Sequence, residues 1–119
     1  MADVADYRVI SDGNATIQTS GDIDRTFTFD LGTGVQHNQP AVLQAFYVSG
    51  SNANNLSFQF SINGTAVRTI NVYGNHFATI HEVQSGVTKN NQNELEIKIV
   101  GGSGSVTISD IVLFVQRTV

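Results

Sequence analysis

The 119-residue chain has no cysteine, no tryptophan and only one proline. Without cysteine it can form no disulfide, and it has no thiolate to bind a metal or attack a substrate. Basic residues are also scarce: six Lys and Arg lie scattered along the sequence, and the net charge is −4. Because no basic patch is available to neutralise phosphates, we expect neither a nucleic-acid partner nor docking on an anionic membrane.

Long apolar runs are missing as well. No stretch approaches the ~18 consecutive apolar residues of a membrane-spanning helix. The first ten residues, MADVADYRVI, contain two aspartates and lack the apolar centre of a secretory signal. The sequence therefore leaves two locations open: cytoplasmic, or exported by a route that uses no signal peptide.

The residues that are abundant are typical of an all-β protein. Apolar residues make up 40% of the sequence, which is enough for one core. Short runs rich in Val, Ile, Phe, Tyr and Thr alternate with clusters of Gly, Asn and Ser. The predicted strands are Tyr7–Ile10, Ala15–Thr19, Arg25–Leu31, Val42–Ser49, Leu56–Ile62, Ala66–Val72, Phe77–Val83, Glu94–Val100 and Val106–Gln116. With no linker or repeat, the pattern predicts a single domain over residues 1–119.

Three of these runs, around Phe27, Leu56 and Leu95, alternate apolar and polar residues with the period of a half-buried strand. Asn63-Gly64 predicts a two-residue type I′ hairpin turn, because both central residues of that turn need a positive φ. Many short antiparallel strands joined by such turns predict a two-sheet antiparallel β-sandwich of the jelly-roll type. The run VLQAFYVS is apolar on both faces, so we expect it to be central or covered by a loop or partner.

Three stretches resemble the jelly-roll sandwiches of the galactose-binding-like and carbohydrate-binding-module group. They are LSFQFSINGTAVRTI, NQNELEIKIVGGSGSV and the closing VTISDIVLF. The resemblance spans roughly Leu56–Val115 and concerns strands and turns rather than a catalytic signature. It implies the fold and, by analogy, a carbohydrate ligand. The chain departs from the group in having no Trp, which such modules often use to stack on sugar rings.

Asp110 stands directly before five apolar residues in the last predicted strand. The apolar residues change parity there, which predicts a β-bulge. We expect a buried carboxylate that accepts hydrogen bonds from backbone N–H groups at the bulge. The resemblance implies an alternative, because in calcium-bearing modules of the group an acid near the first strand shares a structural Ca²⁺ with this aspartate. Asp6 would be that acid, and no other metal or cofactor is expected.

Little in the sequence points to catalysis. His37, His76 and His81 lie in no recognised nucleophile or metal motif, and no pair of carboxylates is placed to cleave a glycoside. Asp22 and Asp24 could bind Ca²⁺ together with backbone oxygens, but an ion pair with Arg25 at a solvated turn accounts for them more simply. We therefore expect a protein that is not an enzyme.

The ligand-binding candidates are Tyr73, Asn75 and His76 in the stretch VYGNHFATIHEV. An aromatic face together with amide and imidazole groups is suited to sugar contact. A hairpin whose tyrosine merely covers a sheet edge is the competing interpretation. The Asn-rich tips Gly50–Asn55 and Thr88–Asn93 are alternative sites, although turn geometry alone accounts for most of their asparagines.

Two functions remain open. The first is a non-enzymatic, lectin-like module that binds a neutral glycan and gains avidity by forming a homo-oligomer. The second is a structural, self-assembling subunit of a capsid, fibre or matrix with no small-molecule ligand. The two-sided apolar strands favour self-association under either interpretation, and they predict at least a dimer built through a sheet face or edge.

Overall fold

The computed structural model describes residues 3–118. Over this range the chain forms eight strands and no helix. The strands are β1 (Asp3–Gln18), β2 (Asp24–Phe29), β3 (Ala41–Ser49), β4 (Asn54–Ile62), β5 (Thr65–Val72), β6 (Phe77–Gln84), β7 (Asn93–Ser103) and β8 (Ser105–Thr118). No helix long and apolar enough to cross a membrane occurs among these residues.

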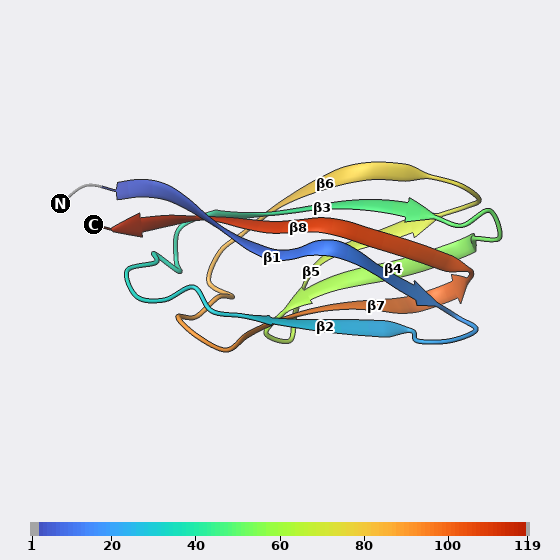
Figure 1. The fold of residues 1–119 in the computed structure, drawn as a ribbon, viewed down its shortest axis with the longest axis horizontal. Helices are drawn as coiled ribbons and strands as arrows, with labels where there is room; N and C mark the ends of the chain where they lie inside the picture. The colour runs from blue at the N-terminus through green and yellow to red at the C-terminus, as the bar shows by residue number, and fades with distance from the viewer. Residues whose placement is uncertain (1–2, 119) are drawn as a thin grey trace.

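The strands form two antiparallel four-stranded sheets that pack face to face (Figure 1). The first sheet has the order β1-β8-β3-β6, and the second has the order β2-β7-β4-β5. Every connection except the β4–β5 hairpin passes from one sheet to the other. This order is that of the jelly roll, so the predicted fold is confirmed. The molecule is 51 Å long and 22 Å in each of the other directions.

The N-terminal part of the fold differs from the prediction. Tyr7–Ile10 and Ala15–Thr19 were predicted as separate strands, but both belong to the single strand β1. The pairing of β1 with β8 continues through register shifts between Val9 and Asn14. The Asp-Gly pair in this stretch is therefore the site of a bulge rather than the end of a strand.

The β4–β5 hairpin has the predicted turn. Ile62 pairs with Thr65, which leaves Asn63 and Gly64 as the two loop residues. Their φ values are 50° and 84°, the positive values that a type I′ turn requires. The Asn63 side chain also donates to the Val87 carbonyl oxygen at 2.7 Å, so the turn is joined to the β6–β7 loop.

The core lies between the two sheets and is filled by the inward-facing half of each alternating strand. Phe58 and Phe60 of β4 and Leu43 of β3 are fully buried. The alternation in β4 and β7 predicted this correctly. β3 is a central strand between β8 and β6, as its two-sided apolar pattern predicted.

The structure corrects the prediction for Asp110. A register shift in the β3–β8 pairing confirms the bulge, but the side chain of Asp110 is exposed. Its carboxylate accepts no hydrogen bond from any residue in the range 3–118. The residue instead has a φ of 54°, and Asp is one of the few residues other than Gly that adopt this left-handed conformation readily. Asp110 is thus placed by its backbone and not by its charge.

The proposed calcium pair is not brought together. Asp6 pairs with Val115 in the β1–β8 ladder, so Asp110 lies about five residues, or roughly 17 Å, from Asp6 along the strands. One ion cannot bind both carboxylates. Asp6 instead accepts a hydrogen bond from Arg117 Nε at 2.8 Å.

Candidate functional site

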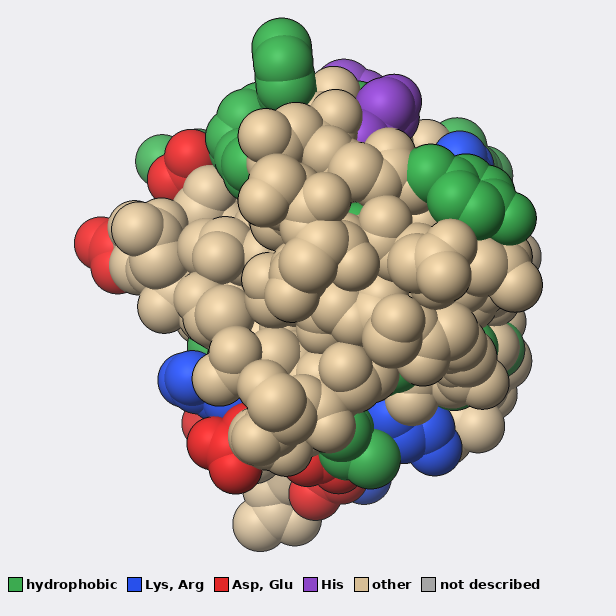
Figure 2. Space-filling view, turned by 90° about the vertical axis from the view of Figure 1, so that its right-hand side faces the viewer, with side chains coloured by type: hydrophobic (Ala, Val, Ile, Leu, Met, Phe, Trp, Pro, Cys, Tyr) green, Lys and Arg blue, Asp and Glu red, His purple; other side chains and the backbone are tan. Residues whose placement is uncertain are grey.

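The candidate residues Tyr73, Asn75 and His76 lie in the β5–β6 loop, at the end of the sandwich opposite the two termini (Figure 1). The β3–β4 connection reaches the same end, because Gly74 N donates to the Ala53 carbonyl oxygen at 2.7 Å. The tip Gly50–Asn55 therefore lies beside the candidate residues. Seen end-on, the middle of this end consists mainly of backbone and uncharged polar side chains, with charged, apolar and histidine side chains towards its margin (Figure 2).

Tyr73 presents most of its ring to solvent. Its side chain is 65% exposed, and its hydroxyl donates to Asn55 Oδ1 at 3.2 Å. Asn71 Nδ2 donates to the same Asn55 oxygen at 2.9 Å and to Ser57 Oγ at 2.8 Å. These contacts join the tyrosine to a row of neutral polar side chains on the outer face of the second sheet. The ring is thereby held while its face remains available.

Asn55, which anchors this row, is positioned by its backbone. Its φ is 50°, a conformation that Asn tolerates better than most residues. Gly102 of β7 packs directly against it, because a Cβ atom on Gly102 would lie 1.9 Å from the Asn55 carbonyl oxygen. Any side chain at position 102 would therefore displace the residue that holds the Tyr73 hydroxyl.

His76 is anchored to the first sheet instead. Its ring stacks on that of Tyr47, with 5.7 Å between the centroids, and its Nδ1 lies 2.8 Å from the Tyr47 hydroxyl. Burial raises the pKa of Tyr47 above its usual value of 10.0, so this hydroxyl remains protonated at neutral pH. When it donates to Nδ1, the ring proton of His76 is on Nε2, where an exposed donor is available to a ligand.

The backbone between the two rings is fixed by Ser49. Its hydroxyl, which is buried, donates to the Gly74 carbonyl oxygen at 2.6 Å and accepts from His76 N at 2.9 Å. Asn75 lies between these contacts, is exposed, and has no side-chain hydrogen bond within residues 3–118. The loop thus carries an aromatic ring supported by the second sheet, an imidazole supported by the first sheet and, between them, an amide that is free of side-chain hydrogen bonds within residues 3–118.

The second Asn-rich tip lies at the other end of the molecule and is largely structural. Asn93 is fully buried, accepts hydrogen bonds from Asn63 Nδ2 and Lys89 N, and donates to the Lys89 carbonyl oxygen. An open hollow of about 710 Å³ lies beside it and is lined by Thr28, Phe29, Asp30, Asn63, Lys89, Gln92 and Glu94. Three of its seven lining residues are charged, so it is less suited to a neutral ligand than the Tyr73 end.

The remaining histidines have structural partners. His37 contacts Thr88 Oγ1 and Asn90 Oδ1, both at 2.8 Å, and so joins the β2–β3 and β6–β7 loops. His81 Nε2 lies 3.1 Å from Gln44 Oε1 across β3 and β6. Within residues 3–118, no group of three or more His, Asp or Glu side chains is arranged to hold a metal ion. Asp22 and Asp24 form no ion pair with Arg25, whose guanidinium instead lies 5.6 Å from the ring centroid of Phe27.

Sequence reasoning missed the supporting residues of the site. Asn55, Asn71 and Ser57 come together because β4 and β5 pair in the register that puts Ser57 opposite Asn71. The Asn63-Gly64 turn sets the register only next to the hairpin, because the pairing shifts by one residue between Phe60 and Ser61. Counting back from the turn would have put Ser57 opposite Ile70, so the turn alone gave no signal for this pair. The contact between Tyr47 and His76 had no signal in the sequence either, because Tyr47 of β3 and His76 of the β5–β6 loop are distant in sequence.

No family model matches the chain, and neither does any curated protein sequence. Solved structures match its fold. The chain aligns over 97% of its length with dimeric latent PorU from Porphyromonas gingivalis, with a TM-score of 0.75 and 12% identity, and spans 13% of that protein. It aligns over 98% of its length with BpGH86A, a beta-porphyranase from the human gut bacterium Bacteroides plebeius, with a TM-score of 0.65 and 21% identity, and spans 21% of it.

The chain also aligns over 97% of its length with the CBM22-1 xylan-binding domain of Paenibacillus barcinonensis Xyn10C, with a TM-score of 0.53 and 11% identity, and spans 87% of that domain. At these identities the similarity concerns the fold. The predicted resemblance to the β-sandwich carbohydrate-binding modules is confirmed at that level. The same sandwich thus forms nearly the whole of one binding module and a minor part of two much larger proteins.

Proposed function

We propose that the chain is a non-catalytic carbohydrate-binding module that binds a neutral glycan at the Tyr73 end of the sandwich. One observation carries the proposal: the ring of Tyr73 is 65% exposed while its hydroxyl is held by Asn55. A ring fixed in this way can stack on the apolar face of a sugar with little loss of side-chain entropy, a contact that contributes about 1 kcal/mol.

The groups around the ring supply the hydrogen bonds that a sugar requires. Asn75 offers both a donor and an acceptor, and His76 offers Nε2. None of these groups carries a fixed charge, which suits hydroxyl groups better than carboxylates or sulfates. The similarity of the fold to a xylan-binding domain supports the proposal only as an analogy.

Titration calorimetry against a panel of soluble neutral oligosaccharides tests the proposal. We expect weak binding by the wild type and about a fivefold loss of affinity in Tyr73→Ala, the effect of removing a contact of about 1 kcal/mol. Tyr73→Phe should retain most of the affinity, because it keeps the ring. An oligosaccharide with one binding epitope is used so that self-association does not alter the result.

Tyr7→Ala is the matched control for this experiment. Tyr7 is 61% exposed, close to the exposure of Tyr73, but it lies on the first sheet near the termini. Its substitution should leave the affinity unchanged. Equal losses in both variants, or no binding by the wild type to any member of the panel, would contradict a glycan site at Tyr73.

A self-assembling structural subunit is the second candidate function. It is favoured by the exposed apolar residues on the outer face of the first sheet, several of which belong to strands whose inner faces already fill the core. Such a subunit would show no affinity for any oligosaccharide of the panel.

A further inference from the structure

The two outer faces of the sandwich differ sharply in composition. The first sheet, β1-β8-β3-β6, has an apolar face formed by its outward-pointing apolar side chains: Tyr7, Val9, Val42, Phe46, Val48, Phe77, Val83, Val112 and Phe114. On the second sheet most outward positions are polar, with Val100 as an exposed apolar exception, and they include four charged residues: Asp24, Glu94, Glu96 and Lys98. Both sheets have four strands, and the outer faces of both meet solvent in the single chain. The outer face of the second sheet therefore shows the composition expected of a face that no partner covers.

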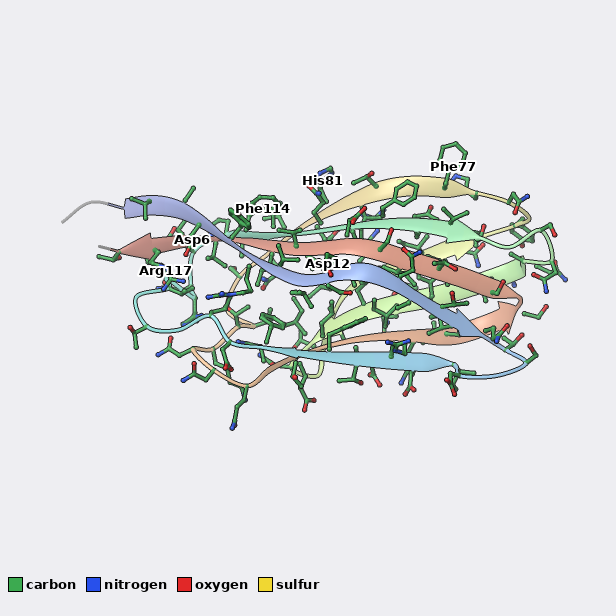
Figure 3. All side chains as sticks on the ribbon, viewed as in Figure 1. Asp6, Asp12, Phe77, His81, Phe114 and Arg117 are labelled. Atoms are coloured by element: carbon green, nitrogen blue, oxygen red, sulfur yellow. The ribbon has the colours of Figure 1, made fainter. Side chains whose placement is uncertain are left out.

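The apolar face is continuous across all four strands. Tyr7 pairs with Phe114 across β1 and β8, and their rings lie 6.3 Å apart. Phe114 pairs with Val42 of β3, and Val42 pairs with Val83 of β6. Directly paired residues share one face of a sheet, so these four side chains form one row across it. Figure 3 shows Phe77, His81 and Phe114 on the outer side of this sheet, away from the second sheet.

These side chains are exposed to a degree that is unusual for their type. The exposed fractions are 71% for Phe77, 62% for Val83, 61% for Tyr7, 47% for Val9, and 41% for both Val48 and Phe114. With about 150–250 Å² for a whole aromatic side chain and somewhat less for valine, these six expose roughly 550 Å². The largest apolar patch on a typical monomer is about 300–600 Å², so this one is at the upper end.

We infer that this face is the interface of a symmetric homodimer, in which two copies pack their β1-β8-β3-β6 sheets together. Homodimer interfaces are about 65% apolar, so roughly 550 Å² of apolar surface corresponds to about 850 Å² buried on each copy. A stable interface of standard size buries about 800 Å² per partner. The apolar face alone is therefore large enough to form a dimer interface of standard size.

The distribution of charge favours a second copy as the occupant. The chain carries a net charge of −4, so two copies repel each other wherever their charged faces meet. The outward positions of the first sheet carry no Lys, Arg or Glu, and their polar residues include Gln44, Thr79 and the exposed His81. The acids nearest to the apolar face are Asp12 of the edge strand β1 and Asp110, which is exposed at the bulge of β8 between β1 and β3. In a twofold dimer the same face of each copy forms both sides of the interface.

Sedimentation velocity from about 1 µM to about 1 mM tests the inference on the intact chain. We expect the wild type to reach twice the 12.8 kDa mass of the chain. Phe114→Lys places a charge in the row that crosses all four strands and should raise the dissociation constant at least about 30-fold, as for an aromatic residue buried in an interface. Gln59→Lys makes the same change of charge on the outer face of the second sheet and should leave the dimer unchanged.

Circular dichroism establishes that each variant is folded. If Phe114→Lys fails to fold, Val83→Lys replaces it, because Val83 is 62% exposed on an edge strand. A wild type that remains a monomer at about 1 mM would overturn the inference. So would a dimer that both lysine variants of the first sheet leave intact, or a monomer that uses this face to bind a polysaccharide or another protein.

Discussion

Asp110 and Tyr73 show that single residues in this molecule are placed by the backbone around them. Asp110 occupies the bulge of β8 because it tolerates a φ of 54°, while its carboxylate stays in solvent. The Tyr73 hydroxyl donates a hydrogen bond to Asn55, which itself has a φ of 50°, while the ring of Tyr73 remains exposed. In both cases the energetically important property is a left-handed backbone conformation that few residue types adopt.

The effect of a substitution at Asp110 on the free energy of unfolding should therefore depend on how well the new residue adopts a positive φ, and not on its charge. Asp110→Gly and Asp110→Asn should leave the free energy of unfolding within about 0.5 kcal/mol of the wild type. Asp110→Val should lower it by about 2 kcal/mol, because a β-branched residue is strained at positive φ. Urea denaturation measures all three, with Ser109→Val as the control next to the bulge. A glycine variant as unstable as the valine variant would show that the carboxylate matters after all.

Elements of the sandwich are joined by short connections whose geometry sets the strand register. The Asn63-Gly64 turn sets the pairing of β4 with β5 next to the hairpin, and a register shift between Phe60 and Ser61 offsets the rest by one residue. The β1 bulge lets one strand follow β8 along most of its length. At the end near the termini, Arg117 of β8 holds the β2–β3 loop. Its guanidinium donates to the Leu31 carbonyl oxygen at 2.8 Å and also to that of Thr33, while its Nε donates to Asp6.

Gly64→Ala tests the turn. Gly64 has a φ of 84° and open space around its Cα, so the only effect of a methyl group is backbone strain. We expect the free energy of unfolding to fall by about 1 kcal/mol, which corresponds to about 4 °C in Tm. Gly13→Ala is the matched control, because Gly13 also has open space but no positive φ. Calorimetry showing equal effects at both glycines would contradict the role given to the turn.

The Asp6–Arg117 pair predicts a pH dependence. The hydrogen bond from Arg117, followed by that from the Tyr7 backbone, holds the pKa of Asp6 below its usual value of 3.8. A carboxyl whose pKa is lowered by folding contributes stability that is complete above the unfolded value and is lost as the pH falls through the folded value. Asp6→Asn should therefore lower Tm slightly at pH 7, and the difference from the wild type should shrink below pH 3.8.

The control for this measurement is Asp12→Asn, which removes an exposed carboxylate on the same strand that has no ion pair within residues 3–118. Its Tm should follow that of the wild type at every pH. A difference between Asp6→Asn and the wild type that persists unchanged well below pH 3.8 would show that the amide disturbs the loop in some other way than through charge.

At the scale of the whole molecule, the proposed glycan site and the proposed dimer interface occupy different surfaces. Tyr73 continues the outer row of the second sheet, whereas the apolar face belongs to the first sheet. A dimer formed through the first sheets would leave both Tyr73 ends in solvent. Two weak sites on one particle can bind a polysaccharide with greater avidity than either site alone.

The two functions should therefore be separable by mutation. Tyr73→Ala should weaken binding of a soluble oligosaccharide about fivefold and leave the sedimentation mass unchanged. Phe114→Lys should produce the monomer and leave that oligosaccharide affinity unchanged, while it weakens binding to a long polysaccharide. Variants of distant sites with no shared partner are expected to act independently. Loss of both properties in either variant would mean that the two surfaces are coupled.

Much of this architecture could be predicted from the sequence because the side-chain pattern of a strand has a fixed period. Alternation in β2, β4 and β7 identified the buried faces, and Asn63-Gly64 identified the hairpin between β4 and β5. These signals depend on residues close together in the chain. The same locality made the bulge at Asp110 visible as a change of parity, although the sequence could not show that the carboxylate faces solvent.

Tertiary structure decided the features that depend on which strands become neighbours. Only the sheet order places Tyr47 behind His76 and joins Tyr7 to Phe114, since these pairs are distant in sequence. The same order separates Asp6 from Asp110 and gives Asp6 to Arg117 instead. Periodicity tells which side chains of a strand share a face, but it cannot tell whether a second sheet, solvent or another copy covers that face. The packing of the two sheets leaves the apolar face of β1-β8-β3-β6 outside.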